Sequence, residues 1–463
     1  MSNHLYSNKY MDKRIKNSVV SPTRFVVFSF LGVILTGTFF LCLPFATTDG
    51  YIPLIDAFFT ATSATCVTGL IVYDTYTKFT LFGQIVILCM IQVGGLGLVT
   101  FTTFFGIAAG KKLGFKTLKV ASSSSSVDNV GEIAVLFKTI FKVVLGCEFT
   151  GFLFLSFVMI PDFGFWDGLW ISFFTSISAF CNAGFDLLGR IGPFVSLTTY
   201  ADNILVNVTV MLLIVSGGLG FTVWHEFTNV REGKKVTFHS KIVLIMTAAL
   251  ILIGAVVFMV LEWNNPATMK DMPTWEKVLA GFFQSVTTRT AGFNTIDQNG
   301  LTGMSKIFSS FLMFVGAAPG GTGGGIKVTT FAVVWVTVFS VIRGRNEAIF
   351  LDHKIDKYTV YKSVSIIVIA LMAVCVTSLT IYYTSDHHLV TGINSVFESF
   401  SAFATVGLST GVTGVMSFAG KVCTILTMFI GRVGPVSLAI SLSLKYNDYS
   451  HREIVPDGRL IVG

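Results

Sequence analysis

The 463-residue sequence is poor in charge: Asp, Glu, Lys and Arg make up only 12% of it, whereas hydrophobic residues make up 52%. Soluble domains carry about 25% charged residues, so most of this surface must face lipid. Apolar runs long enough to cross a bilayer, about 20 residues each, recur along the whole chain. The composition therefore indicates an integral membrane protein without a soluble domain of useful size.

The chain also lacks the patterns of several common chemistries. Its seven cysteines lie in or beside apolar segments, and no C-x-x-C pair or histidine cluster accompanies them. They are expected to be packing residues rather than disulfides or metal ligands. A membrane enzyme would need a convergent set of nucleophiles and bases, and the sequence shows no such set. The N-terminus is polar and basic and has no h-region with a cleavage site, which predicts an uncleaved cytoplasmic tail over 1–23.

The stretch GAAPGGTGGGIK (316–327) looks like a phosphate-binding loop, but its context is wrong. A P-loop requires a preceding strand and a Ser or Thr after its lysine. Here long apolar runs flank the stretch, and Val328 follows Lys327. Glycine costs a helix about 1 kcal/mol relative to alanine and proline about 3 kcal/mol. We predict a break inside a membrane helix, tolerated because it lines a cavity; close helix packing through small residues is the alternative.

One pattern occurs four times: FTATSATCVTGL (59–70), FTSISAFCNAGF (174–185), FFQSVTTRTAGF (282–293) and FESFSAFATVGL (397–408). Aligned without gaps, each copy has Phe ten residues before a glycine and Leu or Phe directly after it. The four glycines are Gly69, Gly184, Gly292 and Gly407. Internal repeats on this scale indicate that one structural unit is used four times.

Each copy has the same surroundings. An apolar span precedes it, at 24–46, 136–160, 241–262 and 361–384, and another follows, at 80–109, 203–228, 302–342 and 419–443. The amphipathic stretch between them is too short to cross the membrane. We therefore predict an all-α membrane protein with eight membrane-spanning helices and four re-entrant half-helices. Its repeats occupy 24–110, 136–230, 241–343 and 361–445, followed by a tail over 446–463.

The basic residues predict the orientation. Most of the 32 Lys and Arg residues fall in the tails and in the connections between repeats, and few fall in the segments between the two spans of a repeat. By the positive-inside rule, both termini are cytoplasmic. The net charge of +7 is then explained by topology and by contact with anionic lipid, without a nucleic-acid partner.

Four half-helices aimed at one axis would present the negative ends of their dipoles to its centre and favour a cation. The residues between half-helix and glycine, CVT, CNA, RTA and ATV, share no side-chain chemistry, so only their backbone carbonyls are common to all four. Carbonyl rings of this kind select potassium, and glycine supplies the positive φ that such a strand needs. A glycine here can also be a simple helix C-cap, but four copies favour a pore.

These motifs, together with GAAPGGTGGGIK, resemble the Trk/Ktr/HKT superfamily of potassium uptake proteins over nearly the whole chain. No additional spans precede the first repeat, which is similar to the KtrB type of membrane subunit. The resemblance implies four M1–P–M2 repeats, each like a potassium-channel subunit, with pseudo-fourfold symmetry around one pore. All four glycines are present, which implies potassium as the transported ion. A less selective potassium/sodium channel is the alternative.

The resemblance also implies partners and surroundings. It implies a homodimer in a bacterial cell membrane, each protomer with its own pore, and a KtrA-like cytosolic ring that binds ATP or ADP. This chain has no nucleotide site or other cofactor site of its own, and its apolar C-terminal RLIVG (459–463) is expected to be buried, for instance at the dimer interface. Sodium stimulation is a trait of the family that we assign to no residue.

The candidate site residues fall into two groups. The filter group comprises Cys66, Val67, Thr68, Gly69, Cys181, Asn182, Ala183, Gly184, Arg289, Thr290, Ala291, Gly292, Ala404, Thr405, Val406 and Gly407. The gate group comprises Gly316, Ala317, Ala318, Pro319, Gly320, Gly321, Thr322, Gly323, Gly324, Gly325 and Arg432. The resemblance implies that the 316–325 loop blocks the pore below the filter and moves aside on opening. Glycines occupy the equivalent place in the other repeats, in GGLG (94–97), GGLG (217–220) and GRVG (431–434).

Charged residues near these groups give further predictions. A membrane-buried arginine costs about 2.5–3.5 kcal/mol, so Arg432 should face the pore or a partner. The resemblance implies that it lies near the gate loop in the ion path, where we predict that it repels or times the cation and donates to loop carbonyls, unless its role is only structural. Arg289 and Glu398 are predicted to form an ion pair between repeats, with an ion-path role for Arg289 as the alternative. Asp56, Asp167 and Glu276 stand at half-helix starts, where they favour the helix dipole and could draw cations inward. A proton-coupled transporter would need further acidic or histidine side chains deep in the spans, and we identify none there.

Overall fold

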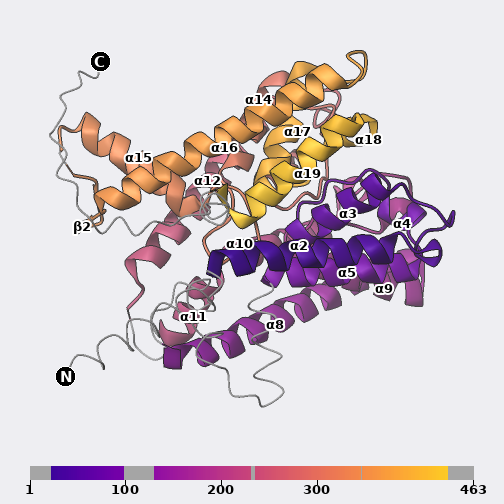
Figure 1. Ribbon diagram of the computed structural model, residues 1–463, viewed down its shortest axis with the longest axis horizontal. Coiled ribbons are helices and arrows are strands. Elements are labelled where there is room, and N and C mark those ends of the chain that lie inside the picture. Colours follow the sequence, from indigo (N-terminus) through magenta and orange to yellow (C-terminus); the bar gives the residue numbers. More distant parts are fainter. Residues whose placement is uncertain (1–21, 98–129, 231–234, 346, 436–463) are drawn as a thin grey trace, which may run out of the picture.

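The structure, a computed structural model, describes residues 22–97, 130–230, 235–345 and 347–435. The predicted tails at 1–23 and 446–463 therefore lie almost wholly outside the described residues. The described part is α-helical, as predicted, except for one antiparallel pair of short strands, β1 (Ile349–Phe350) and β2 (His353–Lys354). Figure 1 shows the helices gathered side by side in an elongated bundle.

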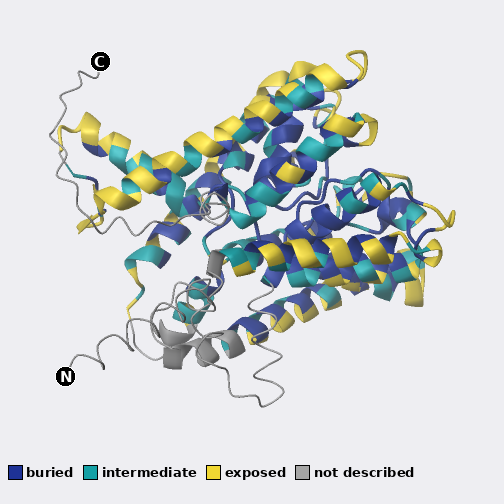
Figure 2. Cartoon of the chain, in the orientation of Figure 1, coloured by how far each residue is buried: buried dark blue, intermediate teal, exposed yellow. Residues whose placement is uncertain are grey.

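Four helices in the described part are long and apolar enough to cross a membrane. They are α2 (Pro22–Leu41), α8 (Val130–Phe163), α12 (Phe238–Glu262) and α16 (Lys357–Thr384). Each coincides with the span predicted before one copy of the repeat. Large apolar side chains are exposed along them, such as Phe28, Phe157 and Val260, and the outer faces of these helices are coloured as exposed in Figure 2. Such a surface suits contact with lipid.

A short helix follows each of these long helices. The four are α3 (Leu54–Cys66), α9 (Phe165–Phe180), α13 (Thr274–Thr287) and α17 (Gly392–Ala404). With at most 16 residues, they are too short to span a bilayer. All four end just before a repeat glycine, and their C-terminal turns are buried in the molecule. They are the predicted half-helices.

The main helices that follow the repeat glycines cover only the first part of the predicted spans, and the third of them ends at the predicted break. These are α5 (Leu81–Leu96), α10 (Ile204–Gly218), α14 (Gly303–Phe314) and α19 (Phe418–Val433). Continuous helix over 203–228 is wrong, because α10 bends by 96° into α11 (Phe221–Val230). In the third repeat a break was predicted, and α15 (Val328–Ile342) resumes after it. Residues 98–109 and 436–443 of the other predicted spans lie outside the described part.

Short elements complete the connections. They are η1 (Pro44–Ala46), α4 (Thr75–Lys78), η2 (Leu188–Arg190), η3 (Thr198–Tyr200) and α18 (Val412–Val415). Except for η1, each of them lies between a repeat glycine and the helix that follows it. In the first repeat the carboxylate of Asp74 caps α4 by accepting from the Thr77 amide at 2.9 Å.

Glycine motifs explain where three of these helices stop. At Gly94, Gly217 and Gly431, an added Cβ would overlap a carbonyl oxygen in the last turns of the neighbouring half-helix. The fourth residue of each motif has a left-handed backbone, with φ of 76° at Gly97, 87° at Gly220 and 92° at Gly434, and such a residue readily ends a helix. Close packing through a small residue therefore occurs at these three positions. Gly316 instead approaches the backbone of its own loop at Gly324.

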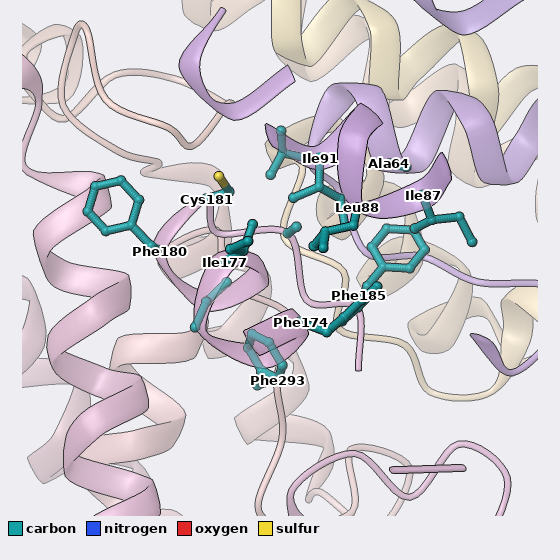
Figure 3. Packing of buried hydrophobic residues seen from close by; sticks show 14 of the residues in the cluster. Ala64, Ile87, Leu88, Ile91, Phe174, Ile177, Phe180, Cys181, Phe185 and Phe293 are labelled. Carbon is teal, nitrogen blue, oxygen red and sulfur yellow. The ribbon is translucent and has the colours of Figure 1, made fainter. Parts of the chain in front are cut away.

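The core surrounds the half-helices. The residue after each repeat glycine is at most 1% exposed, and so are Phe59, Phe174 and Phe397 at the start of the pattern. In the third copy the fully buried side chain is Phe283, whereas Phe282, which the ungapped alignment selects, is only partly buried. Figure 3 shows Phe185 beside Leu88 and Ile87 of α5. This packing fixes the half-helices firmly.

Polar contacts join consecutive repeats. The Asp56 carboxylate of α3 pairs with the Lys421 ammonium of α19 at 2.6 Å. Trp170 of α9 donates to the Gln84 side chain of α5 at 2.8 Å, and Lys306 of α14 donates to the Asn394 side chain of α17 at 3.1 Å. α10 packs on α13 in the remaining junction. Each post-glycine helix therefore contacts the half-helix of the next repeat, and the last repeat closes onto the first.

Candidate ion pathway

The four repeat glycines form a closed ring. A Cβ added to Gly69 would lie 2.5 Å from the Ala183 carbonyl oxygen, and one added to Gly184 would lie 2.7 Å from that of Ala291. A Cβ added to Gly292 would lie 2.5 Å from the Val406 carbonyl oxygen, and one added to Gly407 would overlap the Thr68 carbonyl oxygen. Each glycine thus faces the backbone just before the glycine of the next repeat. The order 69, 184, 292, 407 returns to its start.

The backbone of each filter segment has two left-handed positions. The glycines have φ of 88°, 69°, 85° and 93°, and the residues two before them, Val67, Asn182, Thr290 and Thr405, have φ of 57°, 58°, 70° and 52°. At α3 and α17 the left-handed helix cap is Val67 or Thr405, so the glycine is not the cap. Left-handed residues alternating with ordinary ones can turn successive peptide groups the same way. The carbonyls are then available as a common ligand set.

Hydrogen bonds to the half-helices hold the filter amides. The amides of Gly69 and Gly407 donate to the hydroxyls of Ser63 and Ser401, both at 3.1 Å. The Thr68 amide also donates to the Ser63 carbonyl at 2.7 Å. In the second and third filters, the side chains of Asn182 and Thr290 are hydrogen-bonded to each other at 3.2 Å. Because the amides bond to the scaffold, the carbonyls of these segments are free to face a cation.

A cavity of about 660 Å³ opens on one side of the ring. The four repeat glycines line it, together with polar side chains that include Asp186, Asn294, Asp297, Gln298 and Ser409. The two carboxylates were not among the residues predicted from the sequence, although Asp186 follows Gly184 by two positions and Asp297 follows Gly292 by five. Asp56, Asp167 and Glu276 do not line this cavity; Asp56 pairs with Lys421 and Asp167 with Arg190.

Asp186 lies in the linker after the second filter, outside the helices. Burial raises the pKa of its carboxyl to about 7, the Leu188 amide that donates to it lowers the pKa in part, and the charge of Asp74 adds to the increase. Protonation below that pH removes one negative charge from the cavity wall. The attraction of the cavity for cations should therefore weaken as the pH falls below about 7.

The glycine-rich loop lies against the other end of the filter. The Gly324 amide donates to the Thr405 hydroxyl at 3.0 Å, and the backbone of Gly323 lies against the Thr290 side chain. The Thr322 hydroxyl donates to the Phe180 carbonyl at the end of α9, at 3.2 Å. Thr290 and Thr405 precede the filter glycines, whereas the cavity lies beyond those glycines. The loop and the cavity therefore lie on opposite sides of the ring.

The bend between α10 and α11 holds the loop. The Ala318 amide donates to the Gly218 carbonyl at 3.0 Å, and the Thr322 amide to the Gly217 carbonyl at 3.1 Å. In return, the Phe221 amide donates to the Gly320 carbonyl at 3.0 Å. These bonds satisfy backbone groups that a helix would otherwise pair internally. The sequence shows the glycine motif at 217–220, but it does not predict that the backbone of this motif forms hydrogen bonds with the loop.

Arg432 bridges the loop to the first repeat. Its guanidinium donates to the Thr322 carbonyl in the loop and to the Gly94 and Gly95 carbonyls at the end of α5. The predicted bonds to loop carbonyls are therefore present. A second cation is close by, since the Lys327 ammonium donates to the Gly323 carbonyl at 2.7 Å. Two loop carbonyls therefore accept charge-assisted hydrogen bonds, which are stronger than neutral ones, one from Arg432 in the fourth repeat and one from Lys327 at the end of the loop.

The predicted ion pair between Arg289 and Glu398 is wrong. Arg289 is buried and donates to the Thr247 carbonyl of α12 at 3.1 Å. Glu398 accepts from the Ser409 hydroxyl at 2.8 Å and from the Thr413 hydroxyl, both in the linker after the fourth filter. Each side chain therefore serves its own repeat, because backbone and hydroxyl partners lie nearer than the opposite charge.

Glu148 corrects the prediction that the spans lack an acidic side chain. It lies within α8, is 7% exposed, and accepts from the Gln92 side-chain amide at 3.0 Å. The Gln92 carbonyl oxygen in turn accepts from the Cys181 thiol at 3.4 Å. This chain of contacts connects a buried carboxylate to the first residue of the second filter. A buried carboxylate is costly unless it is hydrogen-bonded, so the arrangement indicates a brace behind the filter.

Replacing Glu148 should test this brace. We expect Glu148→Leu to lower the apparent Tm and the discrimination between potassium and sodium, because it leaves the Gln92 amide unpaired at a cost of about 1–3 kcal/mol. Glu148→Gln keeps an acceptor oxygen and should behave like the parent. Thermal melts and competition uptake measure the two effects. Equal behaviour of the two variants would contradict the brace.

The long helices with exposed apolar side chains and the closed ring of repeat glycines are features of a multi-pass membrane protein of the ion-transport class. A family model described as "TrkH: Cation transport protein" matches residues 13–451. The chain belongs to this family, which confirms the resemblance to Trk and Ktr proteins. The relatives are ion transport proteins, so the chain is a transporter and not an enzyme.

Three relatives support this assignment. The chain is 38% identical to Ktr system potassium uptake protein B of Bacillus subtilis (strain 168), over 98% of this chain and 99% of that protein. It is 35% identical to potassium/sodium uptake protein NtpJ of Enterococcus hirae, with the same coverage. The crystal structure of the potassium transporter TrkH from Vibrio parahaemolyticus matches with a TM-score of 0.72 and 17% identity, covering 92% of this chain and 86% of that one. This last likeness supports the fold alone.

Proposed function

We propose that this protein takes up potassium across a bacterial cell membrane through the ring of filter carbonyls. The main support is the closed ring in which each repeat glycine lies against the backbone of the next repeat; the four are Gly69, Gly184, Gly292 and Gly407. Carbonyl oxygens can replace the hydration shell of a potassium ion, and four half-helix C-termini add partial negative charge at the same place. The name of the Bacillus subtilis relative, which specifies potassium uptake, supports this ion. A less selective pathway is the second candidate, favoured by the relative named for potassium and sodium uptake.

The architecture in the membrane is part of the proposal. Four repeats at 24–110, 136–230, 241–343 and 361–445 would supply eight spans around the pore. The excess of Lys and Arg in the tails and in the connections between repeats supports cytoplasmic termini. The chain would act as a homodimer with a KtrA-like cytosolic ring that binds ATP or ADP, and sodium would stimulate uptake. Homology to proteins of a Ktr system supports this assembly.

Growth and flux test the proposal. A strain that lacks potassium uptake should grow at low external potassium when it carries this chain, and a ring subunit should increase the growth. Purified chain in liposomes should take up rubidium, with excess potassium competing far better than excess sodium. Equal competition by both ions would favour the less selective pathway. Failure of rubidium uptake, with and without the ring, would reject the function.

The loop over 316–325 is proposed as the gate. It lies directly beyond the filter, and Arg432 and the α10–α11 bend hold it there. We expect deletion of the loop to raise rubidium uptake and to make it independent of the ring subunit. The deletion is feasible because Val315 and Ile326, the residues that it would join, already form a parallel bridge. A deletion variant that is no faster than the parent would show that the loop does not limit flux.

A further inference from the structure

A second cavity lies away from the ion pathway, in a groove lined by residues of α8, α10 and α11. Its volume is about 650 Å³, within the range of small-molecule sites. Its walls are mainly apolar, from Val143 and Phe154 on α8 to Leu205, Val208 and Leu212 on α10. Several of these side chains are exposed, so the groove opens to the surroundings of the bundle.

The groove has the dimensions of one leaflet. It extends along α8 from Lys142 to Phe154, and twelve residues of helix rise by about 18 Å. Half of a hydrocarbon core of about 30 Å is slightly less. Glycine forms part of the floor, because a Cβ added to Gly146 would meet no atom within 4 Å. The open space is therefore long and apolar, as an acyl chain requires.

One end of the groove carries charge and an aromatic ring. Lys142 and Trp224 both line it, and Lys142 is exposed, with no ion pair to any residue in the described part. Gly151 packs on Leu213, and Trp224 donates to the Ser216 carbonyl at the end of α10. Those contacts place Trp224 at the Lys142 end. Lysine and tryptophan together are typical of the membrane–water boundary, and lysine there attracts anionic headgroups.

We propose that this groove binds an anionic phospholipid, with one acyl chain between α8 and α10 and the phosphate on Lys142. Bound lipid would also contact the end of α10 that holds the loop. The Ser216 carbonyl accepts from Trp224 at 2.9 Å, and the next two carbonyls, Gly217 and Gly218, accept from the loop amides of Thr322 and Ala318. The lipid therefore packs on the segment that seats the loop. This second step rests on the proposed gating function, whereas binding does not.

Filling the groove tests the binding. Gly146→Leu adds a side chain into open space and favours the helix, so the variant should fold. Gly32→Leu is the matched control, because Gly32 is exposed on α2 and also has no atom within 4 Å of an added Cβ. Native mass spectrometry after exposure to phosphatidylglycerol or phosphatidylcholine counts the retained lipids. We expect the parent and Gly32→Leu to retain phosphatidylglycerol and Gly146→Leu to lose it. Lys142→Met should reduce the preference for phosphatidylglycerol about fivefold.

The outcomes separate binding from gating. Retention of phosphatidylglycerol by Gly146→Leu at the parental level would overturn the site, as would a parent that retains none because another part of the chain covers the groove. For coupling, rubidium uptake is measured in liposomes with and without phosphatidylglycerol. Uptake should depend on this lipid in the parent and not in Gly146→Leu. Equal dependence in both would overturn the coupling. Absence of uptake in every lipid would count against the proposed transport function, while the lipid count still decides the binding.

Discussion

Replacing Gly407 with alanine is expected to lower rubidium uptake at least tenfold and to weaken the preference for potassium over sodium. The glycine has φ of 93°, and an added Cβ would overlap the Thr68 carbonyl and lie 2.9 Å from the Gly69 Cα. A left-handed residue with a Cβ costs about 1–2 kcal/mol, and the displaced carbonyl belongs to the proposed ion ligands. A loss of about 1.4 kcal/mol in ion stabilisation already corresponds to a factor of ten.

Gly411→Ala is the matched control for this variant. Gly411 has φ of 87° and lines the same cavity, but an added Cβ would meet no atom within 4 Å. It therefore suffers the same backbone strain without touching the ring. We expect its uptake to stay within about twofold of the parent and its selectivity to be unchanged. If Gly407→Ala and Gly411→Ala lose uptake equally, strain in the linkers explains the loss and the ring does not.

Local requirements of the backbone made much of this site predictable. A position with positive φ beside a neighbouring carbonyl admits glycine and few other residues, so Gly69, Gly184, Gly292 and Gly407 stand out in the sequence. The long helices were predictable because lipid demands about 20 apolar residues in a row. The break after Phe314 was predictable because no helix tolerates so many glycines and a proline.

Features that depend on partners from other repeats were not predictable. Glu148 is an isolated charge in an apolar run of the sequence, and only the fold shows that Gln92 of α5 donates to it. The ion pair between Arg289 and Glu398 was predicted wrongly for a different reason, because each side chain finds hydrogen-bond partners within its own repeat. The sharp bend after Gly218 exists because the loop of another repeat supplies hydrogen bonds to that backbone. Spacing along the chain does not indicate which of these residues come into contact in the folded protein.

Replacing Arg432 with alanine is expected to raise the maximal rate of rubidium uptake about tenfold. The guanidinium connects the Thr322 carbonyl of the loop to the Gly94 and Gly95 carbonyls of α5. A hydrogen bond from a charged donor contributes about 1.5–3 kcal/mol, so loss of this bridge should release the loop readily. It also removes a positive charge from the proposed ion path. Initial rates in liposomes at rising rubidium concentration measure the effect, and an unchanged rate would make Arg432 merely structural.

Lysine at the same position separates the two reasons. The Arg432→Lys variant keeps the positive charge, but an ammonium on a flexible stem cannot reproduce the planar fork that reaches carbonyls on both sides. If the bridge limits flux, Arg432→Lys should be nearly as fast as Arg432→Ala. If repulsion limits flux, the lysine variant should stay near the parental rate while alanine is fast. Combining Arg432→Ala with deletion of the 316–325 loop sharpens the answer, because a bridge without its loop has nothing to hold. The double variant should then be no faster than the loop deletion alone, whereas a further increase would assign the effect to charge.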